Sequence, residues 1–208
     1  MNFSRNSLKL VALILALLAL FAASAASAQQ RKYLFYVGTY TENGTASRGI
    51  YAYRLDAATG EATPLGLAAE TTNPSFVALS PDGRFLYAVN ELENYNGANT
   101  GAVSAFAVDR PTGRLTFLNQ VGSRGSAPCY IIVDKSGRHV LVANYVGDSV
   151  AVFPVLEDGK LGEASDFIAR RTGHGANPKR QEAPHAHSID LSPDNHFGFV
   201  DDLGLDEM

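Results

Sequence analysis

The fold of this chain is indicated by the stretch NPSFVALSPDGRFLYAVNE, which occupies residues 73–91. The same pattern returns as APCYIIVDKSGRHVLVANY at residues 127–145 and as AHSIDLSPDNHFGFVDD at residues 186–202. Each copy contains two apolar runs that flank a short turn rich in Pro, Asp, Ser and Gly. The pattern predicts two antiparallel strands joined by a tight hairpin, in which glycine supplies the positive φ that such turns need.

A second repeated unit fills the intervals between these copies. IYAYRLD begins at Ile50, VSAFAVD begins at Val103 and VAVF begins at Val150, and a glycine-containing turn follows each of them. The copies recur after 54 and 58 residues, counted from Pro74 to Pro128 and from Pro128 to Ala186. Four short antiparallel strands in a period of about 50 residues are typical of one blade of a β-propeller. A β-sandwich with fortuitous internal similarity is the alternative, and three copies in register disfavour it.

The predicted fold is therefore all-β, a β-propeller of four-stranded antiparallel blades with about three and a half blades present. In the first complete copy the strands are expected at residues 75–80, 85–90, 101–109 and 115–121, from the central channel outward. YLFYVGTY at residues 33–40 aligns with the second strand of a blade, so the first blade has no innermost strand of its own. A closed ring needs at least about four blades. We therefore expect residues 29–208 to be a partial propeller domain, truncated at the C-terminus.

Residues 1–28 have the pattern of an export signal peptide. Arg5 and Lys9 precede an apolar run at residues 10–23, and Ala26-Ser27-Ala28 is typical of a cleavage site. The run has 14 residues, whereas about 20 are needed to span a bilayer. A cleaved signal is therefore favoured over an uncleaved membrane anchor. We expect a mature chain that begins near Gln29 and is exported to the periplasm or secreted.

The composition of the remaining chain excludes some classes of partner. It contains 15 Lys and Arg residues against 21 Asp and Glu residues, so its net charge is near −6. Such an acidic chain is no general nucleic-acid binder, and beyond the export signal we expect no membrane contact. Cys129 is the single cysteine, so no intramolecular disulfide can form and stability rests on packing.

The hairpins predict one functional face. In each blade the start of the first strand and the end of the second strand meet at the same end, which forms a rim. The rim residues are Gly38, Thr39, Tyr40, Ser75, Asn90, Glu91, Cys129, Tyr130, Asn144, Tyr145, His185, His187, Asp201 and Asp202. The longest rim loop, residues 173–184, is basic and follows Arg170 and Arg171. A basic rim would attract an anionic small molecule; the alternative is a solvated strand edge kept from aggregating by its charge.

His185 and His187 lie two residues apart, where the third copy of the pattern begins. Side chains two apart in a strand face the same side of the sheet. If the extended run already includes Pro184, both imidazoles therefore face one side and form a candidate site. The alternative is that His185 belongs to a loop and that His187 is a structural histidine.

Several of these segments resemble one known family, the lactonase family of seven-bladed β-propellers. The resemblance lies in RQEAPHAHS at residues 180–188, YVGTY at residues 36–40, DLGLD at residues 202–206, and the strand ends Asn90-Glu91 and Asn144-Tyr145. That family includes the bacterial 6-phosphogluconolactonase of propeller type and is related to the fungal carboxy-muconate cyclase. The resemblance covers the mature chain and about the N-terminal half of such a protein. Asp201 stands where the family pattern implies a small residue, so its carboxylate either disturbs strand packing or faces solvent.

The resemblance implies the hydrolysis of a small anionic, sugar-type lactone at the rim. We expect His187 to be the general base, because an imidazole can accept a proton at neutral pH, with His185 beside it and Glu91 orienting or re-protonating it. Asn144 could donate to the oxyanion, and Arg180 with Lys179 could bind a carboxylate or phosphate. The remaining expected substrate contacts are Gln181, Asn90 and Tyr145.

Other functions remain open at this point. The same acid and base could close an unsaturated dicarboxylate to a lactone, and a non-catalytic exported propeller could bind a ligand or protein through the same rim. The two histidines could also supply two metal ligands, with Glu91 and Asp202 as the nearest further candidates. We predict neither a metal nor a cofactor, and the sequence indicates no particular oligomeric state.

Overall fold

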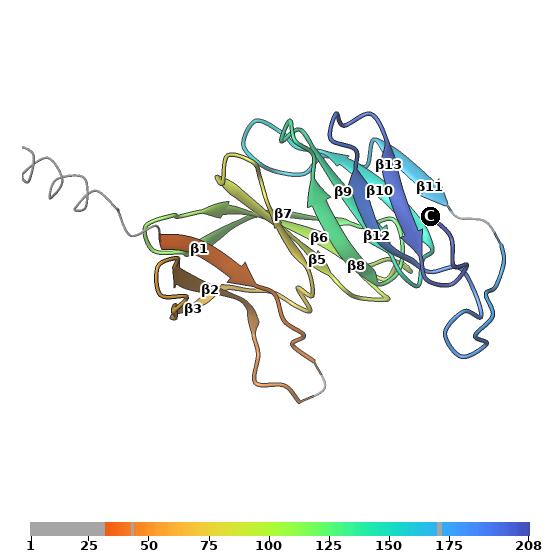
Figure 1. The fold of residues 1–208 in the computed structure, drawn as a ribbon, viewed down its shortest axis with the longest axis horizontal. Helices are drawn as coiled ribbons and strands as arrows, with labels where there is room; N and C mark the ends of the chain where they lie inside the picture. The colour runs from red at the N-terminus through yellow and green to blue at the C-terminus, as the bar shows by residue number, and fades with distance from the viewer. Residues whose placement is uncertain (1–31, 43, 170–171) are drawn as a thin grey trace, which may run out of the picture. The chain divides into compact units, whose positions relative to one another are not determined.

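The computed structural model describes residues 32–42, 44–169 and 172–208, which form thirteen β-strands (Figure 1). The expected export signal and the arginines Arg170 and Arg171 lie outside these described residues. In the described part of the chain, no helix is long and apolar enough to cross a membrane. The contacts divide the chain into two compact units. Residues 34–54 and 63–208 form the larger one, and the smaller includes the turn at residues 55–62, where Gly60 N donates to Asp56 O (2.8 Å).

The strands form four sheets, named Blades I to IV in chain order, and within each blade consecutive strands pair. Blade I contains β1 (Lys32–Val37), β2 (Gly49–Asp56) and β3 (Ala62–Glu70). Blade II contains β4 (Val77–Leu79), β5 (Phe85–Asn90), β6 (Ala102–Val108) and β7 (Leu115–Gly122). Blade III contains β8 (Pro128–Val133), β9 (His139–Asn144), β10 (Ser149–Pro154) and β11 (Asp166–Ala169). Blade IV contains β12 (Ala186–Leu191) and β13 (Gly198–Asp202).

The predicted all-β architecture of antiparallel blades is confirmed. Strand β5 has the bounds expected from the repeat, whereas β4 is shorter than the expected residues 75–80. It is shorter because Ser75 N donates back to Asn73 O (2.8 Å) and Ser80 already belongs to the hairpin turn. Blades II and III have all four strands. Within the described residues Blade I has three, beginning with the segment that the alignment of residues 33–40 predicts as the second strand of its blade.

The hairpin turns are stabilised by a repeated set of short polar side chains. In Blade II, Ser80 Oγ donates to Asp82 Oδ1 (2.6 Å) and accepts from Phe85 N (3.0 Å). Gly83 adopts a φ of 67° that an L side chain rarely takes. The Ser80 hydroxyl and the Arg84 guanidinium hold the pKa of the Asp82 carboxyl well below its ordinary value. These turns close the hairpins at the end of each blade opposite the rim.

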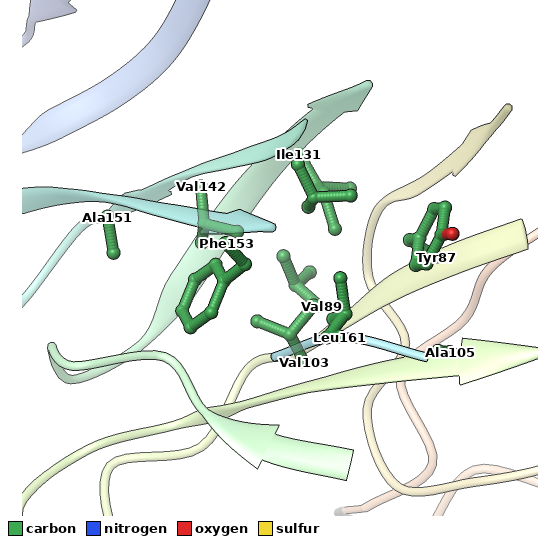
Figure 2. Close-up of a cluster of buried hydrophobic side chains, with 10 residues drawn as sticks. Tyr87, Val89, Val103, Ala105, Ile131, Val142, Ala151, Phe153 and Leu161 are labelled. Carbon is green, nitrogen blue, oxygen red and sulfur yellow. The ribbon is translucent and has the colours of Figure 1, made fainter. Parts of the chain in front are cut away.

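Adjacent blades pack through apolar side chains that their facing strands contribute. Figure 2 shows the cluster between Blades II and III, which includes Tyr87 and Val103 from one blade and Ile131 and Phe153 from the other. The Tyr87 hydroxyl reaches across this interface and donates to Gly159 O (3.0 Å), so its one polar group is satisfied inside the core. Similar clusters lie between Blades I and II and between Blades III and IV. The innermost strand β8 contacts β4, β5 and β12, so the first strands of the blades converge.

Candidate functional site

A repeated backbone hydrogen bond builds the rim. In each of Blades II to IV, the residue that follows the second strand donates its N–H to a carbonyl just before the first strand. The pairs are Glu91 N with Asn73 O (3.0 Å), Tyr145 N with Ala127 O (2.8 Å) and Leu203 N with His185 O (3.0 Å). The start of the first strand and the end of the second strand therefore share one rim in each of these blades, as the hairpin pattern predicts.

A cleft of about 420 Å³ lies on this rim. Its lining residues are Tyr40, Ser75, Phe76, Glu91, Cys129, Tyr145, Arg180 and His187. Ser75, Cys129 and His187 occupy the same position in the three copies of the repeat, and Glu91 and Tyr145 share another. The structure thus brings four predicted site residues together from separate blades: His187, Glu91, Tyr145 and Arg180. Lys179 is exposed and does not line the cleft.

His187 is exposed on β12 and presents its ring to the cleft. Its ring lies edge-to-face with the ring of Tyr145, with centroids 5.8 Å apart and planes at 84°. The backbone carbonyl of His187 accepts a hydrogen bond from the Cys129 thiol (3.4 Å). Its imidazole is therefore oriented by an aromatic neighbour and is accessible to a molecule in the cleft.

Glu91 is held by a phenol from Blade I. The Tyr40 hydroxyl donates to Glu91 Oε2 (2.9 Å). Burial, and next the hydrogen bond to Glu91, raises the pKa of Tyr40 above its ordinary value. The phenol therefore keeps its proton and remains the donor of this hydrogen bond. Gly38 makes this arrangement possible, because a Cβ there would lie 1.9 Å from Pro74 O and separate the two blades at the rim. Tyr40 therefore orients one carboxylate oxygen of Glu91.

The loop before β12 carries Arg180 to the cleft. Gln181 fixes this loop, since its Oε1 accepts from Asn177 N (2.7 Å) and its Nε2 donates to Leu203 O (3.0 Å) and to Asp206 Oδ1 (2.6 Å). Gln181 is buried and its amide is engaged within the protein. It does not face the cleft, although the sequence predicts it as a substrate contact. Of these two neighbours, only Arg180 lines the cleft.

Asn90 and Asn144 also take structural positions instead of the expected substrate contacts. Both are fully buried. The Asn90 amide donates to Thr71 Oγ1 (2.9 Å) and Thr72 O (2.6 Å), and the Asn144 amide donates to Ser123 O (3.1 Å). Each amide therefore ties the end of a second strand to the loop that enters the blade. Neither amide reaches the cleft, so Asn144 cannot supply the expected donor to an oxyanion.

Asp202 occupies the equivalent position in Blade IV. Its Oδ1 accepts three backbone N–H groups, from His185 (2.9 Å), Gly204 (2.8 Å) and Leu205 (3.0 Å). The neighbouring carboxylate of Asp201 is exposed and accepts from Ser188 Oγ (2.7 Å), so it faces solvent and does not disturb the strand. In the described residues, no group of three or more His, Cys, Asp or Glu side chains could hold a metal ion.

His185 is buried and precedes strand β12, whereas His187 is exposed on that strand. Strand β12 begins only at Ala186, and its register shifts between Ala186 and Ser188, so the two imidazoles do not share one strand face as expected. His185 is 7% exposed. Its ring stacks on the ring of Tyr145, with centroids 4.3 Å apart and planes at 4°. Tyr145 therefore stacks on His185 and makes an edge-to-face contact with His187.

Tyr40, Ser75 and Cys129 are predicted on the rim without a role, and Phe76 is not predicted there. The signal that could have found them is positional, because Ser75 and Cys129 share the repeat position of His187. Burial, and next the negative charge of Glu91, raises the pKa of the Cys129 thiol to about 12. Cys129 therefore lines the cleft as a neutral thiol.

A second cleft, of about 360 Å³, lies at the opposite end of the blades, between the turns of Blades II and III. Its charged residues include Asp82 and Arg84, which form an ion pair with each other (2.6 Å). Paired charges leave little attraction for an ionic ligand. The rim cleft, with Arg180 and an exposed imidazole, is the better candidate site.

Comparison with known proteins places this geometry in context. Residues 34–208 match the family model described as Lactonase, 7-bladed beta-propeller. The chain is 38% identical over 177 residues to a 6-phosphogluconolactonase of Bacillus subtilis, covering 85% of this chain and 48% of that protein. It is 34% identical over 171 residues to a 6-phosphogluconolactonase of Formosa agariphila, covering 82% and 47%. The chain thus spans about half the length of the curated relatives it matches.

Solved structures give the same result. The periplasmic gluconolactonase of Pseudomonas aeruginosa superposes with a TM-score of 0.74 at 37% identity, covering 85% of this chain and 48% of that one. A crystal structure of a Bacteroides fragilis protein superposes with a TM-score of 0.77 at 41% identity, covering 86% and 48%. At both identities the likeness includes the sequence as well as the fold.

Proposed function

We propose, from the premise that the chain belongs to the lactonase family of seven-bladed β-propellers, that its rim cleft serves the hydrolysis of a small anionic, sugar-type lactone. The observation that carries the proposal is the meeting of three chemically distinct groups in one cleft. These are the imidazole of His187, the carboxylate of Glu91 and the guanidinium of Arg180. The similarity to the 6-phosphogluconolactonase of Bacillus subtilis and the gluconolactonase of Pseudomonas aeruginosa supports the same substrate class.

The proposed reaction adds water across the ester bond of the lactone. The His187 imidazole takes a proton from a water molecule, whose oxygen attacks the lactone carbonyl carbon. The ring C–O bond of the resulting tetrahedral intermediate then breaks, and the alkoxide takes the proton back from His187, which leaves a hydroxy acid. The ionised carboxylate of Glu91 stabilises the imidazolium that forms between the two steps. Arg180 binds the anionic group of the substrate.

We also infer that the protein acts outside the cytoplasm. The basic start, the apolar run and the small-residue cleavage pattern of residues 1–28 support this inference. A structural relative at 37% identity is itself described as periplasmic. An exported enzyme is separated from phosphorylated cytoplasmic lactones, so the anionic group that Arg180 binds would be a carboxylate rather than a phosphate. N-terminal sequencing of the secreted protein that returned Met1 would overturn the export inference and favour the phosphorylated substrate.

The test is a comparison of purified variants on gluconolactone and 6-phosphogluconolactone, corrected for spontaneous hydrolysis. His187→Ala is expected to lower kcat by about 10²- to 10⁴-fold, because it removes the general base. Arg180→Ala is expected to raise KM for the phosphorylated lactone more than for the neutral one, and Lys179→Ala serves as its control. His196→Ala is the control for His187, because His196 is an exposed histidine that pairs with Asp194 at the opposite end of Blade IV.

Two outcomes would replace the proposal. Wild-type rates in His187→Ala would show that the imidazole is not the base. Ligand binding without turnover in the wild-type protein would favour a non-catalytic binding propeller. The same preparations should be assayed for ring closure of an unsaturated dicarboxylate, because that reaction would use the same acid and base.

A further inference from the structure

We propose that His185 is a positively charged positioning residue: its ring carries both protons, pairs with Glu182 and fixes the Tyr145 ring against which His187 lies. The protonation part of this proposal stands on hydrogen-bond geometry alone. The catalytic part rests on the proposed function, because it acts through His187. His185 would thus have a role different from the second catalytic histidine that the sequence predicts.

The two ring nitrogens of His185 face oxygen atoms that can only accept. Nδ1 lies 3.2 Å from the backbone carbonyl oxygen of Tyr145, and Nε2 lies 3.1 Å from Glu182 Oε1. A neutral imidazole has one N–H and one lone pair. It would therefore satisfy one of these oxygens and turn a lone pair toward the other. Only the imidazolium donates to both.

The surroundings of His185 favour the charged form. The pKa of Glu182 is held below its ordinary value by its own backbone N–H and next by the hydrogen bond to His185, so its carboxylate is ionised. The ring of Tyr145 lies flat against the imidazole (4.3 Å, 4°), and an aromatic face attracts a cation. On the side of β13, the carboxylate of Asp202 accepts the backbone N–H of His185 (2.9 Å). A buried charge is tolerated when it is paired in this way.

The charged ring connects the Arg180 loop to the candidate base. His185 holds Tyr145 at two points, the ring face and the backbone carbonyl. Tyr145 N is fixed by Ala127 O (2.8 Å), so the residue has little freedom to turn. The Tyr145 ring then limits the orientations open to the His187 ring. Glu182 is two residues from Arg180, so the same ion pair lies on the loop that carries the guanidinium.

Two histidines at the hairpin turns of Blades III and IV provide a contrast with His185. His139 and His196 each face one carboxylate through Nδ1, with Asp134 at 3.4 Å and Asp194 at 3.1 Å. One N–H satisfies each of these contacts. The hydrogen bonds of His139 and His196 therefore do not demand a second proton, and the two residues serve as internal references for His185.

The first experiment reads the protons directly. Long-range ¹H–¹⁵N spectra of the protein labelled at its histidines distinguish a ring with two N–H groups from either neutral tautomer. At neutral pH, His185 is expected to show two protonated nitrogens. In Glu182→Gln the amide NH₂ group can donate to Nε2, so His185 is expected to lose one proton while the stack on Tyr145 remains. A singly protonated ring in the wild type, or two protons retained in Glu182→Gln, would overturn the charge assignment.

The second experiment separates positioning from support of the fold. In Glu182→Ala the His185 ring and its stack remain, but the counter-charge is gone. We expect kcat on a sugar lactone to fall about tenfold, which is less than the roughly 10²-fold that a 1 Å misplacement of a reacting group can cost. The melting temperature of Glu182→Ala should not change, because the Glu182 side chain is 59% exposed. His196→Ala should keep the wild-type kcat. An unaltered kcat in Glu182→Ala would overturn the positioning role. If His187→Ala were also unaltered, the proposed function would have failed, whereas the protonation state would still stand on the spectra.

Discussion

At the scale of single residues, Cys129 shows how the cleft controls chemistry. A thiol in a cleft beside a histidine suggests a nucleophile, but the thiolate is the reactive form. The pKa of Cys129 is raised to about 12, first by burial and then by the negative charge of Glu91. The raised pKa therefore argues against a covalent cysteine intermediate and is consistent with the proposed attack by water.

This leads to a prediction about reactivity. At pH 7.5 the fraction of Cys129 in the thiolate form is about 10³-fold lower than for a thiol with the ordinary pKa of 9.0. Iodoacetamide should therefore modify the folded protein at least about a hundredfold more slowly than the protein unfolded in urea. The folded rate should rise steadily with pH through pH 10, because the thiolate population is still growing. Equal rates in both states would show that the burial of Cys129 is wrongly described.

The sequence could identify the rim but not the direction of each side chain on it. Hairpin geometry alone predicts that Glu91, Tyr145 and His187 lie on one face, and they share the cleft. It could not separate Glu91 from its neighbour Asn90, which is buried and hydrogen-bonded to the entering loop. Side-chain alternation is unreliable at strand ends, because the chain leaves the ladder there. The shift of register at Ala186 shows the same limit for His185.

At the scale of elements, the hairpin turns carry electrostatic stability that does not involve the cleft. Asp82 accepts from Ser80 Oγ, from Arg84 N and from Arg84 Nε. Its pKa is lower in the folded chain than its ordinary value of 3.8. Folding is therefore favoured by the ionised form of Asp82. This contribution is present above about pH 4 and is lost as the pH falls toward the folded pKa.

We predict a pH-dependent effect of Asp82→Asn. At pH 7 the variant should be less stable by about 1 kcal/mol or less, because the carboxylate is 48% exposed and its charge is screened. The difference from the wild type should shrink as the pH falls below about 4. Urea unfolding at several pH values measures it, and Asp190→Asn, which removes an exposed charge from β12, is the control. A difference that stayed constant down to pH 2 would contradict this account.

Repeats in the sequence predict the elements better than local propensity does. The bounds of β5 follow from the pattern, because its apolar run is buried between two neighbouring strands. The shorter β4 could not be foreseen, because the Ser75 N–H donates back to Asn73 O (2.8 Å) and Asn73 itself adopts a φ of 43°. Such a backbone conformation in a residue other than glycine follows from tertiary hydrogen bonds. Those bonds are absent from any local pattern.

At the scale of the whole molecule, Blades II to IV each pack against their neighbours through their own apolar cluster. Stability is then approximately a sum over blades and the interfaces between neighbours, as in other repeat proteins. The repeat period predicts this architecture without any structural information. In the described residues, β13 pairs with β12 and, through a single bridge at Asp202, with Glu207. The remaining edge of β13 is open, with Phe199 46% exposed.

We predict that the 208-residue chain self-associates through β13. Open strand edges with apolar side chains are templates for pairing with another chain. Phe199→Lys places a charge on this strand and should raise the concentration at which association begins by about tenfold, which corresponds to about 1.4 kcal/mol. Light scattering across a dilution series measures the effect. Leu156→Lys changes an exposed apolar side chain in a turn and is the control; an equal shift in this variant would indicate a general effect of charge.

Ser75, Cys129 and His187 occupy one repeat position in three copies, and the rim beside each of them is closed by the same backbone-to-backbone hydrogen bond. A copied gene segment would therefore inherit a finished scaffold together with one codon open to change. A mutation at that codon alters what the cleft offers a substrate and leaves the buried asparagines and the turns untouched. Selection can then explore new chemistry one blade at a time, while the ancestral residue persists in the other copies.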